Sequence, residues 1–116
     1  MSRKTTGNAG EQAARRLLEQ HGLQHVQSNY RCDLGEIDLI MRDHHHWVFV
    51  EVKSRDNEVF AHILEQITAA QCQRIRRCAQ FFLMEHQLNE HTTALRFDVV
   101  TVVNSTQQAQ WLQDAF

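Results

Sequence analysis

Three charged residues lie inside two otherwise apolar runs of the sequence. Asp38 interrupts the run GEIDLIM, and Glu51 and Lys53 interrupt the run WVFVEVK. Two carboxylates that approach one another either share a proton or hold a cation between them. Carboxylate oxygens suit Mg²⁺ or Mn²⁺, and a lysine beside them can orient a water or stabilise charge on a phosphoryl group. If these three side chains meet, they predict a site that hydrolyses phosphodiester bonds.

The two apolar runs predict a pair of strands, over residues 35–42 and 46–53, joined by a short polar turn. Side chains alternate across a strand, so Glu51 and Lys53 share a face with Trp47 and Phe49. In the first strand, alternation puts Glu36, Asp38 and Ile40 on one face.

The turn decides whether the charges meet. With the histidines at 44 and 45 in its centre, paired residues sum to 89, which places Asp38 opposite Glu51. The same register places Glu36 opposite Lys53, and opposed β-carbons lie roughly 4.5–5.5 Å apart. A four-residue turn with this centre keeps the register, whereas an odd-length turn or a bulge would break it. The competing interpretation is an edge hairpin whose charges are simply solvated, although two aromatic residues share the Glu51 face.

The rest of the chain predicts a mixed sheet with helices packed on it, in the α/β or α+β range. Periodicity and turn signals predict two helices, three further strands or strand candidates and one ambiguous segment. The helices are expected over Ala9–His21, with Gly22 as a C-terminal cap, and over Thr68–His86; the strands over Gln24–Arg31, Leu95–Val103 (internal) and Gln108–Trp111 (a short edge); and a loop or short helix over Asn57–Gln66.

Composition limits the class of protein. The length of 116 residues fits one domain, over residues 1–116, of which residues 1–7 are expected to be flexible. No apolar run is long enough to span a bilayer, so a cytoplasmic protein with no membrane partner is expected.

The three cysteines are expected to be free thiols. A net charge of −2 excludes nucleic-acid binding through overall charge, so any such contact must come from a local patch.

The sequence resembles the bacterial YraN family, within the PD-(D/E)xK nuclease superfamily of restriction endonucleases and Holliday junction resolvases. The resemblance is carried by a series of stretches in this order: GNAGEQAARRLLEQHGL, NYRCDLGEIDLIMRD, WVFVEVKSR, the helix with residues 74–83, RFDVVTVV and WLQDAF. It implies a restriction-endonuclease-like α/β fold, with a mixed central β-sheet flanked by helices.

The resemblance also implies roles for five residues. Asp38 and Glu51 correspond to the acidic metal ligands, Lys53 to the catalytic lysine, and the Val52 carbonyl to an oxygen that often completes the metal shell. Glu11 corresponds to a helix glutamate that helps hold metal or water in resolvase-type members. From the residues alone, Asn8 and Glu11 also have the spacing of a capping box, and the two interpretations stay open.

Nucleic-acid contacts are expected from the second helix. Gln71 stands where related sequences often carry a lysine, and with Thr68 it has capping-box spacing. Arg74 and Arg77, with neighbouring Arg76, are candidates for phosphate contacts, as are Arg15 and Arg16 of the first helix, although arginines on a helix are commonly a solvated face. Two weaker features favour structural roles: the histidines at 44–46 as an exposed turn, and Arg96 with Asp98 as an internal ion pair.

The sequence therefore predicts a Mg²⁺- or Mn²⁺-dependent DNA endonuclease without a small-molecule cofactor. Branched DNA would suit the resolvase-type resemblance, which also implies a homodimer because two strands must be cut. The alternative is a catalytically silent module of the same fold that binds nucleic acid or protein, which the acidic charge balance and Gln71 favour.

Overall fold

The computed structural model describes residues 2–55, 67–104, 106 and 108–116, with side chains from residue 9 onward. The elements follow one another as α1 (Ser2–Gln20), β1 (Gln24–Cys32), β2 (Gly35–Arg42), β3 (Trp47–Arg55), α2 (Ala69–Glu85), β4 (Leu95–Val103) and β5 (Ala109–Leu112). The predicted order is confirmed, although the first helix begins earlier than Ala9. The ambiguous segment Asn57–Gln66 lies outside the described residues.

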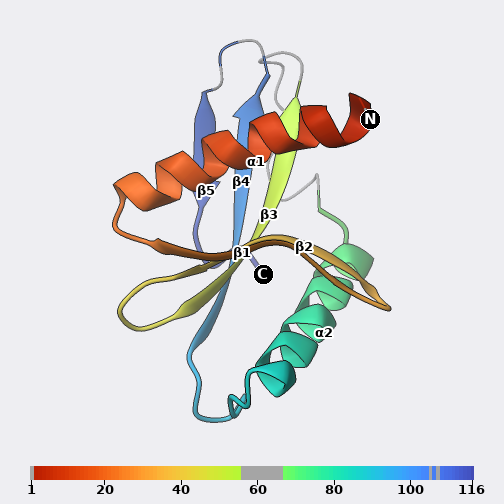
Figure 1. Cartoon of the computed structure of the whole chain (residues 1–116), viewed down its shortest axis with the longest axis vertical. Coiled ribbons are helices and arrows are strands. Elements are labelled where there is room, and N and C mark those ends of the chain that lie inside the picture. Colours follow the sequence, from red (N-terminus) through yellow and green to blue (C-terminus); the bar gives the residue numbers. More distant parts are fainter. Residues whose placement is uncertain (1, 56–66, 105, 107) are drawn as a thin grey trace.

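The strands form one mixed sheet in sequence order, β1-β2-β3-β4-β5. Neighbouring strands are antiparallel except β3 and β4, which run parallel from Trp47↔Leu95 to Arg55↔Val103. β4 lies between β3 and β5 and its residues from Phe97 onward are buried, as expected for an internal strand (Figure 1). The predicted mixed sheet flanked by helices is thus confirmed.

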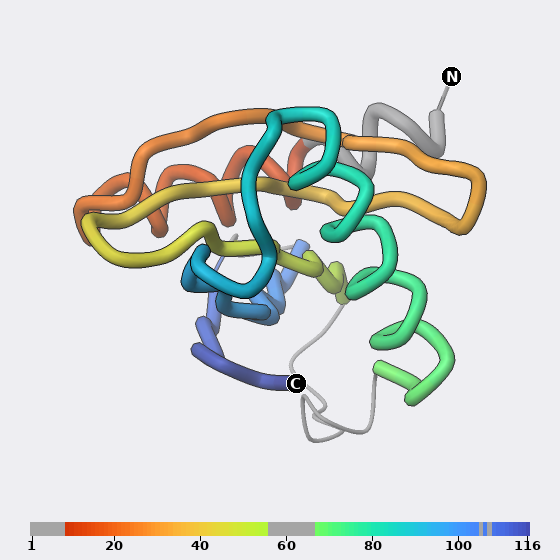
Figure 2. Tube along the Cα trace, turned by 90° about the horizontal axis from the view of Figure 1, so that it is seen from below, coloured from red at the N-terminus to blue at the C-terminus, as the bar shows by residue number. Residues whose placement is uncertain are grey.

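The two helices cover opposite faces of the sheet. Ala13, Ala14 and Leu18 of α1 pack in one buried cluster with alternate residues of β2, β3 and β4, such as Met41, Val50 and Val100. The buried side chains of α2 pack in a second cluster with the other set, such as Ile40, Phe49 and Val99. Figure 2 shows the β1–β2 hairpin, in orange to yellow, extending over α2, in green to cyan. Among the described residues, no helix is long and apolar enough to cross a membrane.

The start of α2 confirms the predicted capping box. The Thr68 side chain accepts a hydrogen bond from the Gln71 backbone N–H at 3.1 Å, and Gln71 Oε1 accepts from the Thr68 N–H at 2.9 Å. This reciprocal pair satisfies two backbone donors that the first turn would otherwise leave free. The side-chain oxygen of Gln71 therefore caps the N-terminus of α2.

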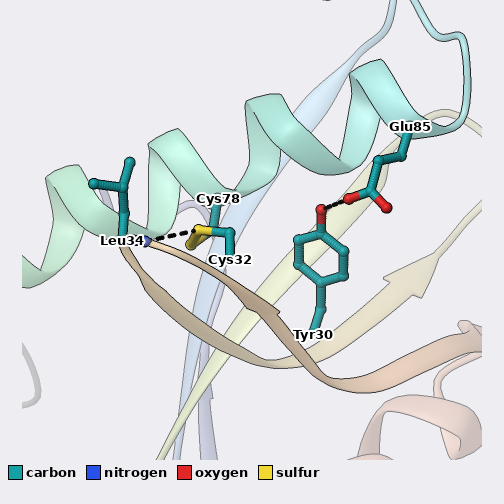
Figure 3. Close-up of a disulfide and its surroundings, with 5 residues drawn as sticks. All are labelled: Tyr30, Cys32, Leu34, Cys78 and Glu85. Atoms are coloured by element: carbon teal, nitrogen blue, oxygen red, sulfur yellow. Dashed lines mark hydrogen bonds between the residues drawn. A yellow bond between two sulfur atoms is a disulfide. The ribbon is translucent and has the colours of Figure 1, made fainter.

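The prediction that all three cysteines are free thiols is wrong for two of them. Cys32, at the end of β1, forms a disulfide with Cys78 of α2, with the Cα atoms 5.9 Å apart (Figure 3). Beside it, the Tyr30 hydroxyl donates a hydrogen bond to Glu85, which also joins β1 to α2 (Figure 3). Sequence spacing gave no sign of the bond, because the two cysteines are 46 residues apart and only the packing of α2 on the hairpin brings them together. Cys72 is free and partly buried.

Arg96 and Asp98 form the internal ion pair that the sequence favoured. Asp98 is fully buried and accepts hydrogen bonds from Arg96 Nε at 3.0 Å, Trp111 Nε1 at 2.8 Å and the Asp114 backbone N–H at 2.9 Å. Arg96 also reaches Asp43, at 3.4 Å, in the turn that joins β2 and β3. One carboxylate therefore holds together β4, β5 and the end of the chain.

Replacing Asp98 by alanine is expected to lower the free energy of unfolding by about 3–5 kcal/mol, because it leaves a largely buried guanidinium and two donors without their acceptor. Urea denaturation followed by circular dichroism measures the loss. The matched control is Asp33→Ala, at an exposed turn, which should change stability by less than about 0.5 kcal/mol. Equal losses in the two variants would contradict the structural role of Asp98.

Candidate active site

The β2–β3 register agrees with the prediction made from the turn. The hydrogen-bonded pairs run from Arg42↔Trp47 to Leu39↔Val50, and each pair sums to 89. In the turn between them, Asp43 Oδ1 accepts hydrogen bonds from the backbone N–H groups of His45 and His46, at 2.8 and 2.6 Å. The histidines at 44–46 thus form the predicted turn.

Asp38 lies where the backbone pairing of β2 and β3 ends. Instead of a ladder bond between the strands, its Oδ2 accepts a hydrogen bond from the Val52 backbone N–H at 2.8 Å. The carboxylate therefore points across the opening between the strands, toward β3. This contact places it beside Glu51, as predicted.

The predicted alternation along β2 is wrong at Asp38. Ile37 and Ile40 pack in the same buried cluster, on the α2 side, whereas Leu39 and Met41 pack on the α1 side. A regular strand would place residues 37 and 39 on one face. The strand therefore changes its facing at Asp38, so Glu36, Asp38 and Ile40 do not form one regular row. Glu36 has no pairing with Lys53 in the hydrogen-bonded register, and it lies against Asn29 instead.

Glu51 is partly buried and shares a hydrogen bond with the Asp38 carboxyl. Burial, this hydrogen bond and the Asp38 charge raise the pKa of Glu51 to about 9. A carboxyl with so high a pKa keeps its proton at neutral pH unless a cation replaces it. In the metal-free protein, Glu51 is therefore a neutral carboxyl beside Asp38 at neutral pH.

Lys53 lies two residues beyond Glu51, on the same side of β3. Val48, Val50 and Val52 pack toward α1, and Phe49 packs toward α2, so Glu51 and Lys53 project toward the α2 side. The Lys53 charge opposes the rise in the Glu51 pKa, which places its ammonium group within electrostatic range of that carboxyl. Asp38 and Glu51 therefore lie side by side at the end of the strand pairing, and Lys53 lies on the Glu51 side of β3 within electrostatic range.

Glu11 reaches this region from α1. The helix approaches β3 closely at Gly10, where an added Cβ would collide with the Ser54 hydroxyl. Burial, the Asp38 charge and the Glu36 charge raise the pKa of Glu11 to about 7, and a hydrogen bond from Asn29 opposes the rise. Because α1 begins at Ser2, Asn8 is not its N-terminal cap, and the capping-box interpretation of Glu11 is wrong.

The donor set fits a hard divalent cation in its chemistry. Asp38 and Glu51 supply carboxylate oxygens, which Mg²⁺ and Mn²⁺ prefer, and Glu11 lies within electrostatic range of Asp38. In the part of the chain with described side chains, no three histidine, cysteine or acidic side chains already have the geometry to hold an ion. An ion at this point would therefore rely on two carboxylates and water, unless side chains move.

The arginines that were expected to contact nucleic acid lie on two separate surfaces. Arg74 and Arg77 are exposed on α2, and the Arg74 side chain lies over Gly35, where its Cβ is 3.8 Å from the position of an added Cβ. Arg15 lies on α1, across the sheet, and pairs with Glu19 at 3.3 Å. The arginines of the two helices therefore do not form one basic cluster.

Comparison with known proteins places the chain in a family. A family model described as uncharacterised protein family UPF0102 matches residues 10–102. The chain belongs to the UPF0102 family. A UPF0102 protein of Idiomarina loihiensis is 44% identical over 116 residues, the full length of both chains. One from Shewanella sp. strain MR-4 is 46% identical over 112 residues, or 97% of this chain and 99% of the relative.

Membership of UPF0102 confirms the predicted YraN family. The family description names no activity, and the chemistry of this UPF0102 chain rests on the geometry of its own residues. Sequence reasoning missed three features of that geometry: Gly10, Asn29 and the position of Glu36. Only Gly10 had a signal in the sequence, because a glycine inside a helical pattern often marks a close approach of two backbones.

Proposed function

We propose that this chain is a metal-dependent endonuclease that hydrolyses phosphodiester bonds in DNA. The observation that carries the proposal is that the Asp38 carboxylate, held by the Val52 N–H, lies in hydrogen-bond contact with Glu51, with Lys53 on the same side of β3. The order of elements, with the hairpin followed by a helix and a parallel strand, supports the restriction-endonuclease-like fold. A homodimer acting on branched DNA is the form of this proposal that cuts two strands.

Each residue has a distinct part in the proposed reaction. Asp38 and Glu51 would hold Mg²⁺ or Mn²⁺, which when bound supplies Lewis acidity toward the phosphate and a more acidic water. The Val52 N–H fixes the Asp38 carboxylate at 2.8 Å, so that this carboxylate is oriented before any ligand arrives. Lys53 orients the attacking water and stabilises the negative charge that develops on the phosphoryl oxygens.

The function is tested by incubating the protein with linear, nicked, flapped and four-way DNA in Mg²⁺ or Mn²⁺, beside Glu51→Ala. The proposal expects cleavage of at least one substrate that depends on the metal and is lost in the variant. Cleavage that survives Glu51→Ala would disprove the site. No cleavage together with no metal binding by calorimetry would favour the binding module, which the acidic charge and the capping role of Gln71 support.

Replacing Lys53 by methionine is expected to slow cleavage by about 100-fold or more, since a positioned proton-transfer or charge-stabilising group contributes at least that much. Mn²⁺ binding should persist, because the carboxylates remain. Single-turnover cleavage and calorimetry separate the two effects, and Lys53→Arg tests whether charge alone suffices. A methionine variant that loses metal binding would place Lys53 in a structural role instead.

A further inference from the structure

Asn29 occupies an unusual position at the edge of the candidate site. The pairs Ser28↔Leu39 and Tyr30↔Ile37 flank it, so in register it lies opposite Asp38. Its backbone φ of 55° lies in the left-handed region. Residues other than glycine rarely adopt this region, and asparagine is among those that tolerate it best. Both strands are therefore irregular at the same level, where the site lies.

The Asn29 side chain joins two carboxylates from different elements. With its amide oriented to donate, Nδ2 lies 2.8 Å from Glu36 Oε1 in β2 and 2.9 Å from Glu11 Oε2 in α1. A carboxamide nitrogen carries two hydrogens, so one asparagine can donate to both acids at once. Without such a donor, two carboxylates this close would repel one another and turn apart.

The Asn29 amide lies beside a hollow that Glu11 also lines. Asn29 and Glu11 line an open hollow of about 250 Å³ between α1 and the β1–β2 hairpin, with Gln12, Arg15, Ser28 and Leu39. The charges of Glu36 and Asp38 act on both Glu11 and Glu51. The orientation of Glu11 and Glu36 therefore affects the electrostatics of the whole acidic group.

We propose that Asn29 is a positioning residue of this site, whose amide holds Glu11 and Glu36 beside Asp38. The proposal rests on the metal-dependent function proposed above. It explains why asparagine suits the position: glycine would accept the backbone conformation but has no donor, and glutamine has the donor but tolerates the conformation less well. The bond also links α1 to the hairpin at the level of the proposed ligands.

The test compares Asn29→Gly with Gln87→Gly. Both residues carry an amide and a positive φ, 55° and 57°, and Gln87 is an exposed residue that follows α2. Glycine keeps each backbone conformation, so both variants should fold. Asn29→Gly should weaken Mn²⁺ binding or slow cleavage by about 10–100-fold, the usual effect of losing a residue that orients ligands. Gln87→Gly should change neither.

A double-mutant comparison separates positioning from general structural support. In a background with both Glu11 and Glu36 changed to alanine, the loss caused by Asn29→Gly should fall to less than about threefold, because neither position then offers an acceptor to the Asn29 amide. An undiminished loss there would show that Asn29 acts by another route and would overturn the proposal. Wild-type Mn²⁺ binding and cleavage by Asn29→Gly would overturn it while leaving the proposed function intact. A wild-type chain that neither binds Mn²⁺ nor cleaves DNA would overturn the function and the role of Asn29 together.

Discussion

Replacing Glu51 by glutamine is expected to abolish metal-dependent cleavage while making the metal-free protein more stable than the wild type at pH 7. Burial and Asp38 raise the pKa of Glu51 to about 9, so the folded protein holds this carboxyl in its neutral form at that pH. Glutamine has the same shape and no charge, and its amide can donate to Asp38 as the protonated carboxyl does. It cannot neutralise a cation, so activity should fall by more than the 10–100-fold typical of residues that only support a ligand.

Thermal melting with and without Mn²⁺ measures this effect independently of any DNA substrate. An ion that binds only the folded state raises the melting temperature, so the wild type should gain stability with Mn²⁺ and Glu51→Gln should gain much less. Glu90→Gln, in an exposed loop, is the matched control and should respond like the wild type. Equal Mn²⁺ stabilisation of all three proteins would rule out Glu51 as a ligand.

The metal-free protein is expected to lose stability as the pH rises from about 5 to 9. The pKa of Glu51 is about 9 in the folded chain against an ordinary value of 4.5, so in this window the folded state holds a proton that the unfolded state has released. Stability falls with pH wherever the folded state binds more protons, and the contribution is lost as the pH passes the folded pKa. Glu11, with a pKa of about 7, adds to the fall only in the lower part of the window.

Urea denaturation at a series of pH values, on the wild type and on Glu51→Gln, tests this dependence. The fall between pH 7 and 9 should be much smaller in the variant, which should be the more stable protein throughout this range and by the widest margin at pH 9. Mn²⁺ should be bound more tightly as the pH rises over the same range, since the ligands must lose their proton, and calorimetry in buffers of different ionisation enthalpy should detect its release. A wild type whose stability rises steadily from pH 5 to 9 would contradict the high pKa of Glu51.

The two proposed functions differ most clearly in these experiments. A silent binding module of the same fold can keep the Asp38–Glu51 hydrogen bond as a structural contact, with the same dependence of stability on pH. It would show no Mn²⁺ stabilisation and no proton release on adding the ion. The metal response, rather than the pH profile alone, therefore decides between an enzyme and a module.

Most features of the β2–β3 hairpin could be predicted from local sequence pattern. Alternating apolar residues on either side of a polar turn predicted both strands, and the turn centre predicted the register that joins Leu39 to Val50. This register brings the two strands together up to Leu39 and Val50, and the hydrogen bond from the Val52 N–H then places the Asp38 carboxylate beside Glu51. The alternation of faces failed at Asp38 because its carboxylate replaces a ladder bond to Val52, a side-chain contact that no periodicity encodes.

Other parts of the site depend on residues far apart in the sequence. Glu11 was predicted as a site residue only from the family resemblance. Its position in the structure depends on the close packing of Gly10 against Ser54. The Cys32–Cys78 bond likewise depends on where α2 packs on the hairpin. The Arg15 and Arg74 side chains were candidates for one basic group, and the sheet separates their helices.

By itself, the sequence determined the elements, the β2–β3 register and the three charged residues of the hairpin, because period and turn chemistry are local properties. Only the tertiary structure decided how α1, β1 and β2 share the Asn29 amide, and how deeply Glu51 is buried. Those features arise from packing between elements, and packing fixes the electrostatic surroundings of each carboxyl. The same residues on a solvated hairpin would have ordinary acidity, whereas burial raises the pKa of Glu51.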